Sequence, residues 1–142
     1  MSEKIFQLDI VTPMKIIYSA KVSSFSAPGV EGGFQVLKSH APLLAGLTIG
    51  EIKLTDTAGK EHSYATSGGF AEVHEDKVIL LAETAEDAEH IDFERASASL
   101  QRAQERLSSK QQGLDHERAH VALARAKNRL KIARKVAATP TH

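Results

Sequence analysis

The sequence predicts a β + α fold, in which an antiparallel β-sandwich or barrel is followed by an antiparallel two-helix hairpin. Short apolar runs separated by turn residues occupy the chain up to about residue 86. At Asp87 the apolar residues change to the spacing of a helix, and a polar segment interrupts that pattern once. We therefore expect two domains, a β domain at residues 1–87 and a helical hairpin at residues 88–142.

The N-terminal part contains runs that are typical of strands, because they are rich in β-branched residues and often alternate apolar with polar side chains. The expected strands are Lys4–Val11, Ile16–Tyr18, Val22–Ala27, Phe34–Leu37, Glu51–Leu54, His62–Thr66, Phe70–His74 and Val78–Leu81. Turn residues separate these strands, and we interpret Gly68-Gly69 as a tight turn or a bulge. Many short strands without intervening helices favour an antiparallel architecture.

The C-terminal part predicts two amphipathic helices. Apolar residues recur every three to four positions, first at Phe93, Ala96, Leu100, Ala103 and Leu107, then at Ala119, Ala122, Leu123, Ala126, Leu130 and Ala133. The polar segment Ser108–Gly113 joins them, so an antiparallel hairpin is the natural arrangement. Alanines on the buried stripes allow a close approach, and we expect the tail from Ala137 to be frayed.

Composition excludes several classes of protein. The absence of cysteine excludes a disulfide framework and a thiolate zinc site. No apolar run reaches the roughly 18 residues of a membrane helix, and no signal sequence is recognisable, so we expect membrane association only through a partner.

Charge is divided unevenly along the chain. Residues 1–88 contain 7 Lys, no Arg and 12 acids, whereas residues 89–142 contain 7 Arg, 4 Lys and 6 acids. No acid follows Glu117. This asymmetry indicates either an acidic partner or ligand for the basic half, or a solvated cationic helix face.

The segment His116–His120 matches the H-E-x-x-H pattern of zinc peptidases, in which two histidines share a helix face. Such a site needs a third protein ligand, and downstream there is no acid and only His142. The other histidines lie in separate segments without ligand-like spacing. We therefore interpret the match as a coincidence and expect neither a metal site nor a catalytic site.

Four arginines have a spacing that suits a phosphate ligand. Arg95 and Arg102 are two turns apart on one helix face, roughly 10 Å, and Arg125 and Arg129 are one turn apart on the other helix. An antiparallel hairpin would bring the four together over a length comparable to a triphosphate. Guanidinium forks bind phosphate oxygens in pairs. The alternative is that these arginines make ordinary surface ion pairs.

Several segments resemble one known family along nearly the whole chain. They are Val11-Thr12-Pro13, Gly33–Leu44 with its His-Ala-Pro-Leu-Leu sequence, Ser67–Val73 with its Ser-Gly-Gly-Phe sequence, and Leu81–Glu86. In this order, ahead of a helical hairpin, they resemble the epsilon subunit of bacterial F-type ATP synthases. Gln35 and Lys38 depart from the family's loop, which commonly has Gly and Pro at these positions.

The resemblance also implies a nucleotide site. Ile91–Ala96 is similar to the family's motif Ile/Leu-Asp-x-x-Arg-Ala, and three further arginines fall where ATP-binding members carry them. The implied ATP-binding residues are Glu86, Ile91, Asp92, Arg95, Arg102, Arg125 and Arg129. Asp92 also stands where it would cap the first helix. ATP would be a regulatory ligand, and no cofactor is required.

The resemblance implies a ten-stranded β-sandwich that docks on the gamma subunit and the c-ring, and a hairpin that either folds down or extends into the alpha/beta catalytic hexamer. The extended hairpin would block hydrolysis through an inhibitory basic face that meets acidic segments of the catalytic subunits. That face comprises Arg125, Lys127, Arg129, Lys131, Arg134 and Lys135. The implied location is peripheral, on the cytoplasmic side of the bacterial inner membrane.

The expectation is therefore a non-catalytic, ATP-sensing rotor subunit. The main alternative is a coupling and assembly subunit of the same machine whose hairpin never switches. A zinc peptidase has only the coincidental motif in its favour. A nucleic-acid binder is also disfavoured, because the basic helices carry no stacking aromatics and no known reader motif.

Overall fold

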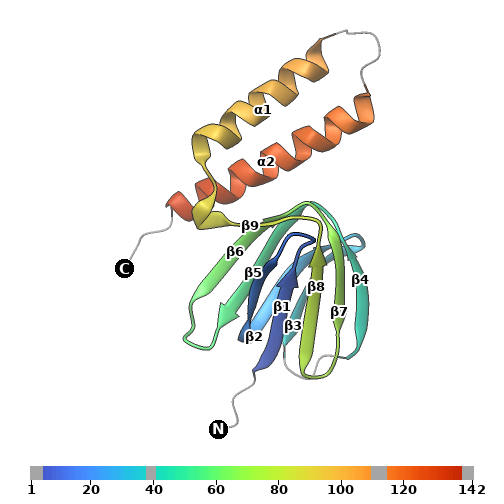
Figure 1. Ribbon diagram of the computed structural model, residues 1–142, viewed down its shortest axis with the longest axis vertical. Coiled ribbons are helices and arrows are strands. Elements are labelled where there is room, and N and C mark those ends of the chain that lie inside the picture. The colour runs from blue at the N-terminus through green and yellow to red at the C-terminus, as the bar shows by residue number, and fades with distance from the viewer. Residues whose placement is uncertain (1–4, 38–40, 110–114, 139–142) are drawn as a thin grey trace. The chain divides into compact units, whose positions relative to one another are not determined.

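The computed structural model describes residues 5–37, 41–109 and 115–138, with side chains described as far as Lys135. The chain divides into two compact units, Met1–Asp87 and Ala88–His142. Strands make up the first unit and helices the second (Figure 1). The predicted β-sandwich followed by a two-helix hairpin is confirmed.

Nine strands occupy the described part of the first unit, where the resemblance implies ten. They are β1 (Phe6–Val11), β2 (Ile16–Gly29), β3 (Gly32–Leu37), β4 (Leu43–Leu47), β5 (Gly50–Asp56), β6 (Glu61–Thr66), β7 (Gly69–Val73), β8 (Lys77–Ala82) and β9 (Ala85–Asp87). Gln35 lies within β3, while Lys38 and His40 of the family-like loop lie outside the described residues.

Three differences from the sequence prediction have physical reasons. The expected strands at Ile16–Tyr18 and Val22–Ala27 are one strand, β2, because the exposed residues between them still pair with β1. We missed β4 because Leu43–Leu47 lacks alternation of apolar with polar residues. We missed β9 because three residues are too few to show a period.

The strands are connected through β2, which pairs with β1 along its first half and with β3 and β5 along its second. The hydrogen-bonded order is β1-β8-β7-β4-β2-β5-β6-β9, and its first five strands form a closed ring because β1 also pairs with β2. The pairing of β1 with β8 is parallel, and the other pairings among the described strands are antiparallel.

The core of the sandwich is mainly aliphatic, with Phe6 and Phe25 buried among the aliphatic side chains. Alternate residues of β1 and β8 face inward, among them Leu8, Ile10 and Leu80, which are fully buried. Phe25 and Phe34 meet edge to face with their ring centroids 6.0 Å apart. Each fully buried side chain of this size contributes about 1.5–3 kcal/mol relative to leaving it exposed.

Gly68 and Gly69, the residue before β7 and its first residue, adopt a conformation that other residues rarely adopt. Both glycines have positive φ, 126° and 139°. A Cβ on Gly69 would overlap the carbonyl oxygen of Leu81. The buried Thr66 hydroxyl accepts a hydrogen bond from the Gly68 N–H at 3.2 Å. The glycines therefore allow β7 to lie against β8 immediately after the turn.

The second unit contains a 3₁₀ turn, η1 (Ala88–His90), and two helices, α1 (Phe93–Ser108) and α2 (His116–Ala138). The first helix has 16 residues, somewhat fewer than the expected 20 or so. Asp92 caps it, since its carboxylate accepts a hydrogen bond from the Arg95 N–H at 3.1 Å. The segment 110–114, which joins the helices, lies outside the described residues.

Most of the residues buried between the two helices are small. Ala96 and Ala103 are buried on α1, and Ala119, Ala126, Leu130 and Ala133 are buried on α2. Two expected core positions are wrong: Phe93 is 46% exposed, and Ala122 is exposed. Ile132 is buried although it lies off the predicted stripe. The second helix also continues through Ala137 and Ala138, which we expected to be frayed, and residues 139–142 lie outside the described part.

Candidate functional site: the cationic helical hairpin

A contact between the helices establishes their register. The guanidinium carbon of Arg134 lies 5.8 Å from the ring centroid of Phe93, within the range of a cation–π interaction. Arg102 follows Phe93 by nine residues, and Arg125 precedes Arg134 by nine residues. Because the helices run antiparallel, Arg102 and Arg125 lie at about the same level of the hairpin.

Helical periodicity divides α1 into two sides. Each residue turns an α-helix by about 100°. Measured from buried Ala96, Arg95 and Arg102 lie about 100–120° to one side, which we call the arginine side of α1. Phe93 and Leu100 lie about 40–60° to the other, which we call its apolar side.

The same geometry divides α2. Measured from buried Ala126, Arg125 and Arg129 lie about 60–100° to one side, while Lys127 and Arg134 lie about 80–100° to the other. Arg134 contacts the apolar side of α1, so the side of α2 that carries Lys127 and Arg134 adjoins it. It follows that Arg125 and Arg129 share an edge of the hairpin with the arginine side of α1.

The structure therefore places the four predicted phosphate-binding arginines on one edge, which we call the arginine edge (Arg95, Arg102, Arg125 and Arg129). The offset of Arg95 from the level of Arg129 is three residues, about 4.5 Å along the axis. Arg102 donates a hydrogen bond to the Ser99 hydroxyl at 3.2 Å. Arg125 and Arg129 also take part in interactions within the protein.

The remaining predicted ATP-binding residues have different surroundings. Ile91 is buried, and its N–H donates to the Ala88 carbonyl oxygen at 3.4 Å. Asp92 is exposed at the start of α1, where it caps the helix beside Arg95. Glu86 lies in β9 and pairs with Ala65 of β6, so it belongs to the first unit, whereas the other six residues belong to the second.

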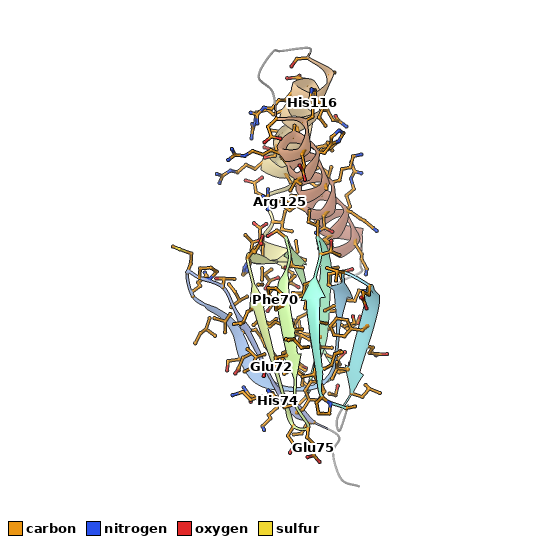
Figure 2. All side chains as sticks on the ribbon, turned by 90° about the vertical axis from the view of Figure 1, so that its right-hand side faces the viewer. Phe70, Glu72, His74, Glu75, His116 and Arg125 are labelled. Carbon is orange, nitrogen blue, oxygen red and sulfur yellow. The ribbon has the colours of Figure 1, made fainter. Side chains whose placement is uncertain are left out.

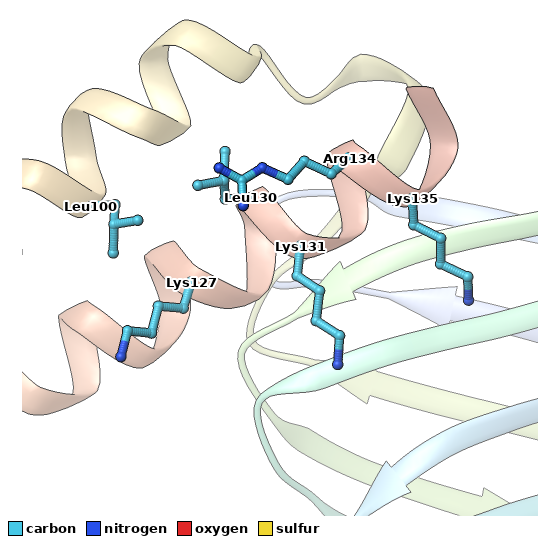
Figure 3. Close-up of a pocket in the computed structure, with 6 residues that line it drawn as sticks. All are labelled: Leu100, Lys127, Leu130, Lys131, Arg134 and Lys135. Carbon is cyan, nitrogen blue, oxygen red and sulfur yellow. The ribbon is translucent and has the colours of Figure 1, made fainter. Parts of the chain in front are cut away.

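The opposite edge of the hairpin carries a pocket that sequence reasoning did not identify. Its volume is about 380 Å³, and its lining consists of Leu100, Lys127, Leu130, Lys131, Arg134 and Lys135 (Figure 3). We call its four cations the lysine edge (Lys127, Lys131, Arg134 and Lys135). The predicted inhibitory basic face thus divides between the two edges. Helical periodicity applied to the basic residues would have revealed the division.

The H-E-x-x-H segment forms the first turns of α2. His116, Glu117 and His120 are exposed, while Ala119 faces the buried interface (Figure 2 shows His116). Within residues 5–37, 41–109 and 115–138, no group of three or more His, Asp or Glu side chains is placed to hold a metal ion.

The sandwich presents an apolar patch that the sequence analysis also missed. Leu44, Phe70 and Leu81 are 73%, 60% and 55% exposed. Phe70 pairs directly with Leu81, and Leu44 lies on the other neighbouring strand, opposite Glu72 and two pairs from Phe70, so the three come from adjacent strands β4, β7 and β8. Figure 2 shows Phe70 and Glu72 in a row along β7, with His74 just beyond the end of the strand. An exposed apolar cluster of this kind is typical of a protein interface.

No helix in the described part of the chain is long and apolar enough to cross a membrane.

Family models match both units. The model for the ATP synthase delta/epsilon chain beta-sandwich domain covers residues 5–88, and the model for its long alpha-helix domain covers residues 89–134. The two matches therefore cover the sandwich, all of α1 and most of α2.

The curated relatives agree with the family models. The ATP synthase epsilon chain of Nitratidesulfovibrio vulgaris strain DP4 is 49% identical over 106 residues, which cover 75% of this chain and 78% of that one. The epsilon chain of Desulforamulus reducens is 45% identical over 104 residues, covering 73% and 78% respectively. This chain belongs to the ATP synthase epsilon-chain family, as the sequence motifs predicted.

Solved structures share the fold. A chain of the Euglena gracilis mitochondrial ATP synthase OSCP/F1/c-ring assembly superposes with a TM-score of 0.79 at 22% identity, covering 98% of this chain and 84% of that chain. A chain of the Tetrahymena thermophila ATP synthase central stalk and c-ring has a TM-score of 0.55 at 16% identity, covering 96% and 98%.

Proposed function

We propose that this chain is a non-catalytic rotor subunit of the central stalk of an F-type ATP synthase. It couples rotation to ATP synthesis and inhibits ATP hydrolysis through its helical hairpin. Family membership supports the first role, and the separation of the chain into a β unit and a cationic hairpin supports the second. The chain works at the cytoplasmic side of the bacterial inner membrane, attached through its partner subunits.

The sandwich is the docking unit in this proposal, and its partners are the gamma subunit and the c-ring. The apolar patch of Leu44, Phe70 and Leu81 supports docking, because such a surface gains most by being covered. Replacing Phe70 with Ser leaves the core untouched, since Phe70 is 60% exposed. We expect the F70S chain to fold normally and to co-purify poorly with the gamma subunit. If the F70S chain co-purifies with the gamma subunit as well as the unmodified chain does, the docking surface does not include Phe70.

The hairpin senses ATP in this proposal, and the arginine edge is the observation that supports it. Arg102 and Arg125 lie level on that edge, with Arg95 and Arg129 within about a turn of one another. Each guanidinium can donate two hydrogen bonds to phosphate oxygens. Only the folded hairpin brings both pairs together, so bound ATP would stabilise the folded state by mass action.

Calorimetry on the full chain tests the ATP site. We expect the Arg102→Gln, Arg129→Gln double variant to bind ATP at least about tenfold more weakly, since one lost charged contact accounts for about that factor. The matched control is the Lys15→Gln, Lys21→Gln variant, which also removes two positive charges but takes them from exposed positions of the sandwich, outside both edges of the hairpin. Equal losses of ATP affinity in the two variants would show that general charge attraction, and not the arginine edge, holds ATP.

Inhibition is tested in the assembled enzyme. We expect an ATP synthase rebuilt with a chain ending at residue 87 to hydrolyse ATP faster than one rebuilt with the full chain. In the enzyme with the full chain, the released hairpin would place its basic residues against acidic segments of the catalytic hexamer, and the shortened chain lacks this hairpin. Unchanged hydrolysis, together with absent ATP binding, would favour a coupling and assembly subunit that does not switch.

A further inference from the structure

The pocket on the lysine edge is a second candidate binding site, separate from the arginine edge. Leu100 and Leu130 contribute its apolar surface, one from each helix, so the pocket exists only while the hairpin is folded. Its volume of about 380 Å³ falls within the range of small-molecule sites, about 300–1,000 Å³.

The lining has one sign of charge. Lys127, Lys131 and Lys135 follow one another at intervals of one turn along α2, as Figure 3 shows, and span about 12 Å. Arg134 completes the cationic lining, and its guanidinium lies over the Phe93 ring. Within the described part of the chain, neither Lys127 nor Lys131 forms an ion pair. An anion entering this pocket would meet the ammonium groups of Lys127 and Lys131 without a competing carboxylate at either.

The combination of surfaces selects a ligand class. A bare inorganic anion would use the cations and leave the leucines covered only by water. An apolar molecule would use the leucines and leave the cations without a partner. We propose that this pocket binds a small organic phosphate with an apolar or aromatic body, in which the body lies on Leu100 and Leu130 and the phosphate accepts hydrogen bonds from Lys127 and Lys131.

This proposal does not depend on ATP sensing, because the two sites use different residues on opposite edges of the hairpin. A ligand in the pocket would cover part of the lysine edge, which belongs to the proposed inhibitory face. It would also contact both helices and so favour the folded hairpin, independently of ATP.

Three probes test the apolar and the anionic contacts separately. 1-Naphthyl phosphate has both an aromatic body and a phosphate. Inorganic phosphate has only the anion, and 1-naphthol has only the aromatic body. Calorimetry on the full chain should show 1:1 binding of 1-naphthyl phosphate. We expect its affinity to exceed that of either partial probe by about tenfold or more. Equal affinity for 1-naphthyl phosphate and one partial probe would contradict the combined site.

Variants locate the binding. The Lys127→Gln, Lys131→Gln chain should bind 1-naphthyl phosphate about tenfold more weakly, whereas the Lys15→Gln, Lys21→Gln control should stay within about twofold of the unmodified chain. Helical circular dichroism verifies that each variant still folds. Loss of binding in the Arg102→Gln, Arg129→Gln variant, with no loss in the lysine variant, would assign the probe to the arginine edge and overturn the proposal. ATP titrations of the same proteins report separately on the proposed function.

Discussion

The two units of this chain are stabilised in different ways. The sandwich buries long aliphatic side chains such as Leu8, Ile52 and Leu80. In its described part, the helical unit buries mostly alanines, with Ile91, Leu130 and Ile132 as the large buried residues. Burying alanine removes far less apolar surface from water, so the hairpin gains less free energy from packing. The comparison indicates a stable unit joined to a marginal one; in our proposal the stable unit docks and ATP shifts the folding of the marginal one.

The largest expected effect is in the core of the sandwich. Ile52 is fully buried, so Ile52→Ala should lower the free energy of unfolding by about 2–5 kcal/mol through lost burial and a cavity. The only two tyrosines, Tyr18 and Tyr64, lie in the sandwich, so tyrosine fluorescence during urea unfolding reports on that unit. A loss below about 1 kcal/mol would remove the contrast between the units.

The turn before β7 offers a somewhat smaller effect. Gly69→Ala should destabilise the sandwich by about 1–3 kcal/mol, because it adds backbone strain and an overlap with Leu81. Gly59→Ala is the matched control, since Gly59 also has positive φ, 84°, but an added Cβ there meets nothing within 4 Å. Urea unfolding compares the two. Equal effects would show that strain alone matters and that the approach to β8 does not.

The sequence predicted the alternating strands and both helices because their periods are local properties of the chain. It did not predict β4 and β9, which become strands through pairing with β7 and β6. Likewise, the arginine spacing predicted the arginine edge, but the pocket needed the register of two helices, which Phe93 and Arg134 reveal. The sequence prediction failed where structure depends on residues far apart in the chain.

The cap of α1 tests the hairpin directly. Asp92→Ala removes the acceptor for the Arg95 N–H and should destabilise the hairpin by about 0.5–2 kcal/mol. Circular dichroism at 222 nm follows the helices during heating. Asp92→Asn is the control, because asparagine caps as well as aspartate does. If Asp92→Asn keeps the helix but weakens ATP binding, the carboxylate has a role beyond capping.

The smallest expected effect concerns pH. Hydrogen bonds from Ser19 and Gln7, helped by Lys77 at 3.8 Å, lower the pKa of Asp9 below its usual 3.8. The ionised carboxylate therefore stabilises the sandwich above about pH 4, and this contribution disappears as the pH falls through the lowered pKa. Ser19→Ala should reduce stability slightly at pH 7 and less at pH 3. An equal loss at both pH values would show that the hydrogen bond does not depend on the charge.

Amide hydrogen exchange with and without ATP tests most directly the claim that ATP stabilises the marginal hairpin. We predict that saturating ATP slows exchange across Phe93–Ser108 and His116–Ala138 and leaves the strands of the sandwich unchanged. The Arg102→Gln, Arg129→Gln variant should show no such slowing. Exchange that ATP leaves unchanged in both helices, or slows equally in the sandwich, would contradict the claim.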